Sequence, residues 1–235
     1  MAVMLKSSAV SAVSKGTKSS FYSGYGGKPN PVFQALEQEV DAYKTFMQKR
    51  VGRRSKRPKD EASSLASDRL FDIWNKYESR LPKMSYQKRL LEMGDFLSSI
   101  KEFNLALWQC YGRYLTSFGE VNVEEITSVE QFKQEFFPDG FETEDAGFTF
   151  RALMGRSICT YEVVRMNDPK LLNTESVDKC LQLLSFLRLV TQVILPKESL
   201  YWLVYNGTIH IYSISRHLMS FGHSAAVLEY LLCLL

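Results

Sequence analysis

The sequence predicts an all-α fold built from antiparallel helical hairpins, and three observations lead to this prediction. Over most of the 235 residues, apolar side chains recur at intervals of three and four, the spacing of one face of an α-helix. Prolines and turn-forming residues divide this pattern into segments of ordinary helix length. Hydrophobic residues make up 45% and charged residues 23% of the chain, which is the composition of a globular protein with a buried core.

The N-terminal segment differs from the rest, because residues 1–29 are mainly Ser, Ala, Lys and Gly with few large apolar side chains. Such a segment buries too little apolar surface to offset the entropy of ordering. We therefore expect a disordered tail over 1–29, followed by a helical domain over 30–235. The tail shares serine and lysine with organelle transit peptides, but it lacks arginine and is interrupted by glycine and proline, which disfavours import.

The first two helices have clear start signals. One is expected from Pro31 to about Arg50, since proline suits the first turn of a helix. A basic linker over 49–62 follows. Either Ser63 or Ser64 can then cap a second helix, which is expected to end at the proline at 82.

Apolar residues continue over 86–118, a span too long for one typical helix, so we expect a break near 98–101 and an antiparallel pair. Part of this span fits the tetratricopeptide pattern, which favours a degenerate tetratricopeptide-like solenoid. The fit fails at Cys110 and Arg113, where an aromatic residue and an alanine would be usual. The matching positions are Leu90, Met93, Gly94, Leu97 and Ala106.

An acidic loop region is expected over 119–145, where nine acidic residues face a single lysine. A short helix over 129–136 interrupts it and stops at a Pro-Asp-Gly turn. Two longer helices follow, over about 146–166 and 174–195, and each ends just before a proline-containing break.

Local rules conflict over 200–221. Asn206 and Gly207 lie between aromatic and β-branched runs, which is the signature of a β-hairpin. Helical spacing also runs through this segment, and its neighbours are helical, so helix and hairpin both remain open.

A second tetratricopeptide-like match follows at Leu218, Phe221, Gly222 and Ala225. The last ten residues are expected to form an apolar helix that ends abruptly, as in a fragment or a short isoform of a longer solenoid protein. The alternative is a short C-terminal helix that docks on the core.

No catalytic constellation is recognisable in the sequence. The four cysteines are far apart and lack metal-ligand spacing, so we expect buried thiols in a reducing compartment. His210, His217 and His223 have no carboxylate at ligand spacing and are expected to be surface or core residues. The longest apolar segment, 181–195, is about half of a bilayer span and contains Arg188. We therefore expect no enzyme activity, cofactor, metal or membrane span.

The sharpest local feature is a run of seven cations in eleven residues. It is interpreted either as a solvated linker, as a contact for an acidic protein surface such as a tubulin tail, or as a nucleic-acid or nuclear-import signal. Nucleic acid is the least favoured partner, because the run contains no aromatic side chain that could stack on bases. The candidate contact residues are Lys49, Arg50, Arg53, Arg54, Lys56, Arg57 and Lys59.

The three tryptophans, Trp74, Trp108 and Trp202, are candidate interface anchors, although core packing is the favoured interpretation for each.

The segment 200–232 contains the runs Leu-Tyr-Trp-Leu-Val-Tyr-Asn-Gly-Thr-Ile-His-Ile-Tyr, Arg-His-Leu-Met and Ala-Val-Leu-Glu-Tyr-Leu-Leu. In these runs the chain resembles the N-terminal region of the cilia- and flagella-associated protein 54 family. The resemblance extends back through Phe-Asp-Ile-Trp-Asn-Lys-Tyr at 71–77 and through 90–107, so it covers the chain from about Val32. The final residues, 232–235, depart from it.

The resemblance implies a very large helical-repeat protein of the axonemal central apparatus of motile cilia and sperm flagella, without catalytic activity. We therefore expect a structural scaffold of the cytoplasm, cytoskeleton and ciliary axoneme that supports cilium assembly, cilium movement and spermatogenesis. Its expected partners are other central apparatus proteins and microtubules. The alternative is a helical adaptor that binds nucleic acid or an acidic partner through 49–59.

Overall fold

The structure, a computed structural model, describes residues 30–52, 59–119, 125–141 and 145–232. The tail expected over 1–29 and the final residues lie outside these ranges. All regular secondary structure in the described part of the chain is helical, which confirms the all-α prediction. The tetratricopeptide-like character of the repeats and the domain division stay predictions.

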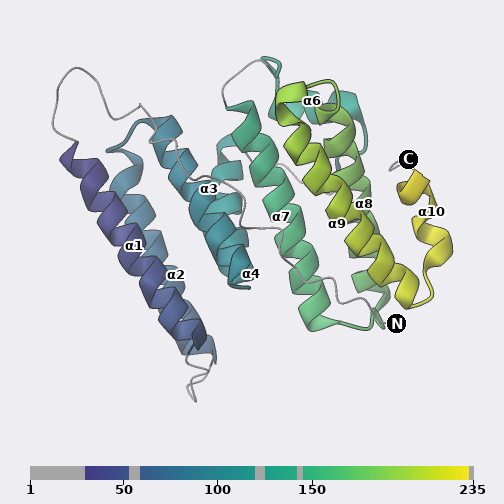
Figure 1. Ribbon diagram of the computed structural model, residues 1–235, viewed down its shortest axis with the longest axis horizontal. Coiled ribbons are helices and arrows are strands. Elements are labelled where there is room, and N and C mark those ends of the chain that lie inside the picture. Colours follow the sequence, from purple (N-terminus) through teal and green to yellow (C-terminus); the bar gives the residue numbers. More distant parts are fainter. Residues whose placement is uncertain (1–29, 53–58, 120–124, 142–144, 233–235) are drawn as a thin grey trace, which may run out of the picture.

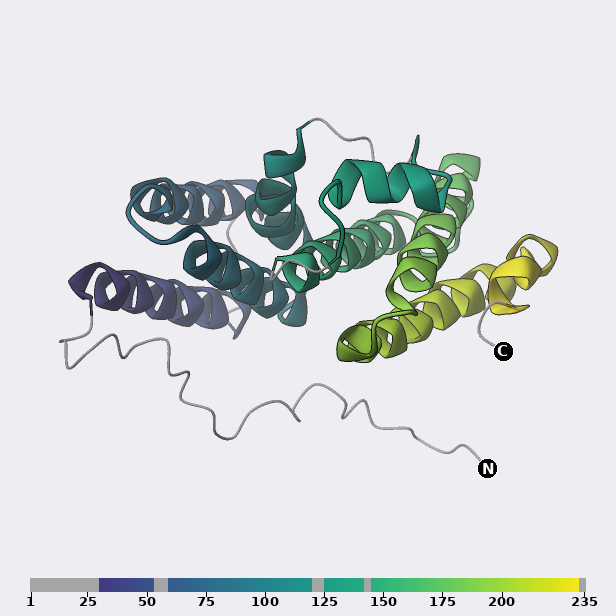
Figure 2. The ribbon, with the colours of Figure 1, turned by 90° about the horizontal axis from the view of Figure 1, so that it is seen from above.

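The helical elements in chain order are α1 (Pro31–Gly52), α2 (Lys59–Glu78), α3 (Lys83–Ser99), α4 (Phe103–Ala106), the π-helical segment η2 (Leu107–Gly112), α5 (Arg113–Leu115), the 3₁₀ turn η3 (Thr116–Phe118), α6 (Val129–Phe136), α7 (Ala146–Asn167), α8 (Thr174–Ile194), the 3₁₀ turn η5 (Glu198–Leu200), α9 (Tyr201–Ser220) and α10 (Ser224–Leu232). Figure 1 shows the helices side by side, from α1 at one side to α10 at the other, with α9 in front of α8. Seen from above, α1 and α9 lie along one edge of the array and α2 and α6 along the other, while α8 runs across from one edge to the other (Figure 2).

Most predicted helix boundaries agree with the structure to within a few residues. The expected break at 98–101 is present, and Lys101 there adopts a left-handed backbone conformation with φ of 65°. The start of α2 is an exception, since the helix begins at Lys59 rather than at Ser63 or Ser64. Because α1 also continues to Gly52, the connection between the two helices is shorter than the expected linker over 49–62.

The segment that the turn signal at Asn206 and Gly207 made ambiguous is helical, so the hairpin alternative was wrong. Gly207 is buried where α9 crosses α7 and α8. A Cβ atom at this position would lie 2.7 Å from the Cε atom of Met154 and 2.8 Å from Oγ1 of Thr191. The glycine therefore permits close helix packing, and this tertiary contact outweighs the local turn preference.

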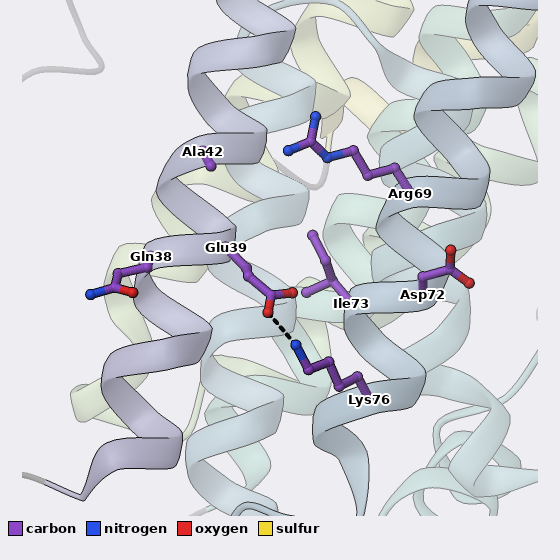
Figure 3. A pocket seen from close by; sticks show the side chains of 7 residues that line it. All are labelled: Gln38, Glu39, Ala42, Arg69, Asp72, Ile73 and Lys76. Carbon is purple, nitrogen blue, oxygen red and sulfur yellow. Dashed lines mark hydrogen bonds and ion pairs between the residues drawn. The ribbon is translucent and has the colours of Figure 1, made fainter.

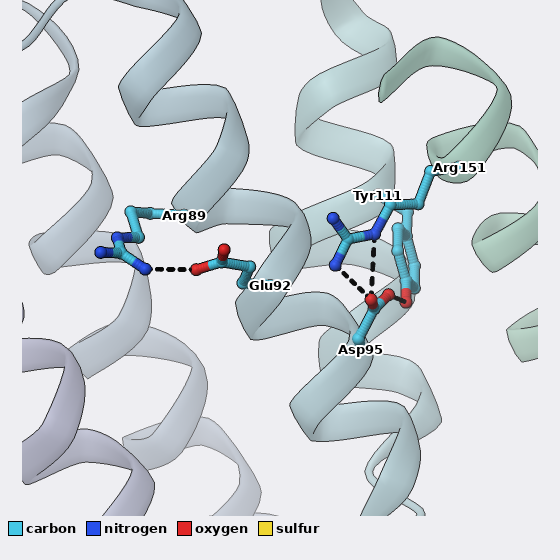
Figure 4. A network of polar contacts seen from close by, with 5 residues as sticks. All are labelled: Arg89, Glu92, Asp95, Tyr111 and Arg151. Atoms are coloured by element: carbon cyan, nitrogen blue, oxygen red, sulfur yellow. Dashed lines mark hydrogen bonds and ion pairs between the residues drawn. The ribbon is translucent and has the colours of Figure 1, made fainter. Parts of the chain in front are cut away.

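Tyr111 forms the joint between α3, η2 and α7. Its ring lies between two glycines, Gly94 of α3 and Gly155 of α7. A Cβ atom at Gly94 would approach Cε1 of the ring to 2.9 Å, and one at Gly155 would overlap the ring still more. The Tyr111 hydroxyl donates to Oδ1 of Asp95 at 2.6 Å, and Nε of Arg151 donates to Oδ2 of Asp95 at 2.9 Å (Figure 4). One carboxylate thus joins three elements.

The two positions that depart from the tetratricopeptide pattern have structural roles. Cys110 is fully buried in the core. Arg113 extends from α5 to α2, where Nη2 donates to Oδ1 of Asn75 at 2.6 Å and to Oε2 of Glu78 at 2.7 Å. Its Nε also donates to the hydroxyl of Tyr86 on α3 at 3.0 Å. This arginine therefore links three helices.

The short helix α6 is held in place by a cap and by aromatic packing. Oγ of Ser128 accepts a hydrogen bond from the backbone N–H of Gln131 at 3.1 Å, which satisfies one free donor of the first turn. Phe132 packs against Phe150 of α7, with ring centroids 6.1 Å apart, and against Phe186 of α8 at 5.9 Å. The acidic region is thus anchored on the helical core.

Gly155→Ala is expected to lower the free energy of unfolding by about 1–3 kcal/mol, because the added methyl group forces the Tyr111 ring out of its place. Gly147→Ala in the same helix is the control. A Cβ atom there would lie 3.7 Å from its nearest neighbour, an ordinary contact, so this change is expected to be neutral or to stabilise by up to about 1 kcal/mol. Urea unfolding followed by circular dichroism measures both, and equal stability of the two variants would contradict the packing argument.

Candidate interaction surface

Of the predicted basic contact residues, the structure describes the side chains of only two. Lys49 is exposed near the end of α1. Arg50 is turned towards the fold, where its Nη2 lies 3.9 Å from Oε1 of Glu102. The side chains of Arg53, Arg54, Lys56, Arg57 and Lys59 lie outside the described part of the molecule. The contact role of the seven cations therefore stays a prediction.

A shallow groove of about 300 Å³ runs between α1 and α2. Figure 3 shows Glu39 and Lys76 pointing towards one another across it, and they form an ion pair. The Tyr77 hydroxyl also donates to Oε1 of Glu39 at 2.8 Å. Burial alone would raise the pKa of Glu39, but the hydrogen bonds from Lys76 and Tyr77 outweigh it and lower that pKa. The Glu39–Lys76 ion pair therefore links the two helices across the groove.

A second link joins α1 to α3, since Nε of Arg89 lies 2.6 Å from Oε1 of Glu37. Arg89 also pairs with Glu92 on its own helix, as Figure 4 shows.

Helix α9 carries a continuous row of exposed apolar side chains, unlike the groove between α1 and α2, where charged side chains pair. The helix buries one face against its neighbours, with Leu203, Ile211 and Leu218 inside. On the other face, side chains at intervals of three and four form one stripe and are between 44% and 67% exposed. We call this stripe the aromatic row of α9. It consists of Tyr201, Trp202, Tyr205, Ile209 and Tyr212.

The tryptophans divide between core and surface. Trp74 is fully buried, as expected. Trp202, in the aromatic row of α9, is 51% exposed, and Trp108, in the π-helical segment, is 71% exposed, so core packing was the wrong interpretation for these two. The intervals of three and four around Trp202 were visible in the sequence. They did not reveal which face of α9 is buried.

His217 uses both ring nitrogens in structural contacts. Nδ1 lies 3.1 Å from the Tyr161 hydroxyl, and Nε2 lies 3.0 Å from the carbonyl oxygen of Pro169. Because that carbonyl can only accept, Nε2 carries a proton, and in the neutral ring Nδ1 then accepts from Tyr161. This histidine therefore ties α9 to α7 and to the turn after α7.

Three of the cysteines, Cys110, Cys159 and Cys180, are free and buried, as the sequence predicted for its thiols. Burial raises the pKa of Cys159 to about 12 and of Cys180 to about 11, and it also raises the pKa of Cys110. A thiol with such a pKa stays protonated near neutral pH and is a poor nucleophile.

Within the described residues, no group of three or more His, Cys, Asp or Glu side chains is arranged to hold a metal ion. No helix in that part of the chain has the length and hydropathy needed to cross a bilayer.

The aromatic row of α9 and the link through Tyr111 both fall within residues 59–234, the region that matches the family model described as cilia- and flagella-associated protein 54. The chain belongs to this family. Members of the family with that name include a human protein that is 46% identical over 213 residues and a mouse protein that is 45% identical over the same length. A protein of Chlamydomonas reinhardtii with that name is 26% identical over 163 residues.

These relatives are much longer than the chain described here. The human and mouse matches cover 90% of this chain but only 7% of each relative, and the algal match covers 69% of the chain and 5% of the relative. The chain thus spans a small fraction of the length of these family members. Their names associate them with cilia and flagella.

The contacts of Glu39 with Lys76 and Tyr77 are expected to make a pH-dependent contribution to stability. Because the pKa of Glu39 is lowered in the folded state, the contribution is present above the ordinary carboxyl pKa of 4.5 and is lost as pH falls through the folded value. Glu39→Gln should therefore lower the denaturation midpoint at pH 7 but have little effect at strongly acidic pH. Asp72→Asn, which neutralises another carboxylate of the same groove, is the control. A pH-independent difference between wild type and Glu39→Gln would contradict the electrostatic account.

Proposed function

We propose that this chain is an interaction module of a structural scaffold in cilia and flagella. In this proposal it acts in the axoneme, where its helices contact other proteins of the central apparatus close to the microtubules. It thereby supports assembly and movement of the cilium, including the sperm flagellum. Family membership supports the ciliary association, since the related proteins carry that association in their names.

The observation that carries the mode of action is the aromatic row of α9. Isolated exposed apolar side chains are ordinary on protein surfaces, but a contiguous stripe of them marks an interaction surface. Tyrosine and tryptophan are enriched at the centres of interfaces, because they bury a large area and lose little side-chain entropy. The row contains three tyrosines and one tryptophan along one helix face.

A non-enzymatic role is part of the proposal. Several groups that could act as a nucleophile or a base are held in structural contacts or in the core. His217 has both ring nitrogens in hydrogen bonds, and the three described thiols are buried with raised pKa values. In the groove between α1 and α2, Glu39 and Lys76 pair with one another.

Replacing Trp202, Tyr205 and Tyr212 together with serine is expected to abolish retention of the tagged protein on axonemes without unfolding it. Substitutions at exposed positions typically change stability by less than about 0.5 kcal/mol each. The measurement is localisation in multiciliated cells, followed by detergent extraction of the axonemes and detection of the tag.

The matched control replaces three exposed apolar residues away from the row, Leu65, Met166 and Leu172, with serine. It should keep the protein on the axoneme. Equal loss from both triple variants would rule out α9 as the docking face, and a wild-type protein that washes out of the axoneme would contradict the proposed function itself.

A further inference from the structure

The exposed face of α9 has a spacing that is symmetric about the middle of the helix. Along η5 and α9, exposed side chains follow one another at intervals of 4, 3, 4, 3 and 4 residues. This alternation is the repeat with which one helix packs against another in a coiled coil. Four of these side chains belong to the aromatic row of α9, and a charged side chain lies at each end. We call the set the α9 seam. It consists of Glu198, Trp202, Tyr205, Ile209, Tyr212 and Arg216.

Each member of the α9 seam has a counterpart at the same distance on the other side of Gly207. If two copies of α9 lie antiparallel with their Gly207 residues level, every seam position of one copy therefore faces its counterpart in the other. Such a self-complementary face is what a dimer with two-fold symmetry requires. The pairs across the two copies are Trp202 with Tyr212, Tyr205 with Ile209, and Glu198 with Arg216.

The middle of the seam is apolar. Its four apolar side chains are between 44% and 67% exposed, so most of their surface is free to be covered by a second helix. Pairing of Trp202 with Tyr212 adds an aromatic contact near each end of the apolar part. From Glu198 to Arg216 the seam extends over roughly 27 Å, at about 1.5 Å per helical residue.

The two charged ends select the antiparallel orientation. Glu198 and Arg216 are exposed, and among the described residues neither takes part in an ion pair. Helix α9 contains no acidic residue of its own that could compete for Arg216. Antiparallel copies bring each Glu198 to an Arg216 and form two ion pairs, whereas parallel copies bring like charges together.

The side chains that border the seam are uncharged and are also arranged in counterparts. Asn206 and Thr208 lie one residue on either side of Gly207, and Tyr201 and Ser213 lie six residues on either side. At these positions an antiparallel pair places no like charges opposite one another. The flanks of the seam are therefore compatible with the close approach that its apolar middle needs.

We propose that the α9 seam binds the same seam of a second copy of this protein, antiparallel about a two-fold axis that passes near Gly207. The inference rests on the proposed function, because it names the partner that the aromatic row of α9 binds in the scaffold. A single pair of helices is a small interface compared with that of most permanent dimers. The association is therefore reversible and depends on protein concentration.

The first test is sedimentation velocity of the complete chain over a series of concentrations, where the wild type is expected to pass from monomer to dimer. Tyr205→Glu places a carboxylate against Ile209 twice in each dimer and is expected to weaken association about a hundredfold. Leu172→Glu makes a similar change at an exposed position outside the seam and should leave association unchanged. Circular dichroism checks that both variants keep the helical content of the wild type.

A charge exchange tests the antiparallel register itself. Arg216→Glu brings two carboxylates together at each end of the seam and is expected to weaken association about tenfold. Adding Glu198→Arg re-forms both ion pairs with reversed sign and should restore the affinity to within about twofold, a recovery that a damaged fold would not give. Lys88→Glu, which makes the same charge change at an exposed position on α3, is the control and should have little effect.

A chain that stays monomeric over the whole series, a dimer that Tyr205→Glu leaves intact, or a charge exchange without recovery would overturn the proposal. A monomer whose retention on axonemes still depends on the aromatic row would assign that row to a different protein and leave the proposed function standing. A seam-dependent dimer that washes out of axonemes would support the inference and contradict the proposed function.

Discussion

Tyr111 lies where three helical elements meet, and the arrangement of the long helices depends on the space that two glycines leave for its ring. Gly94 and Gly155 lie on either side of the ring, so no side chain at these two positions separates α3 or α7 from it. The hydroxyl at the ring's end bonds Asp95, and the same carboxylate holds Arg151 of α7. Apolar packing alone would tolerate small shifts of register, whereas this polar contact specifies one arrangement.

From the Tyr111 joint, contacts between helices extend in two directions to the helices that carry the candidate surfaces. On one side, Arg113 connects α5 to α2 and α3, and Glu39 with Lys76 connects α2 to α1. On the other side, α7 packs on α8 and α9, where Gly207 allows a close crossing. With that face of α9 turned inwards, the aromatic row faces outwards. The position of the row is thus a consequence of core packing, which is how a helical scaffold can present a rigid binding face.

Helices were predictable from the sequence wherever periodicity and capping agreed, as in α1, α6 and α8. The sequence could not decide α9, because the preference of Asn206 and Gly207 for a turn is local, whereas the contacts of Gly207 with Met154 and Thr191 come from distant helices. The exposure of Trp108 and Trp202 was missed for the same reason. Residue type suggests burial, but the partner helix decides which face is covered.

The candidate sites show the same difference between features that the local sequence predicts and features that depend on contacts between distant segments. The basic run was evident as a sequence feature, since its charges are contiguous. A pocket lined by Gln87, Tyr114 and Asp139 had no sequence signal, because these residues are far apart in the chain and become neighbours only when α3, α5 and the turn after α6 assemble.

Native-state hydrogen exchange on wild type and on Tyr111→Leu tests the central role of this joint most directly, because it reports the opening free energy of each helix separately. If the Tyr111 joint couples the two parts of the array, the substitution should lower the opening free energies of α3 and α7 by equal amounts. A loss of protection confined to one of these two helices, with the other unchanged, would contradict the account.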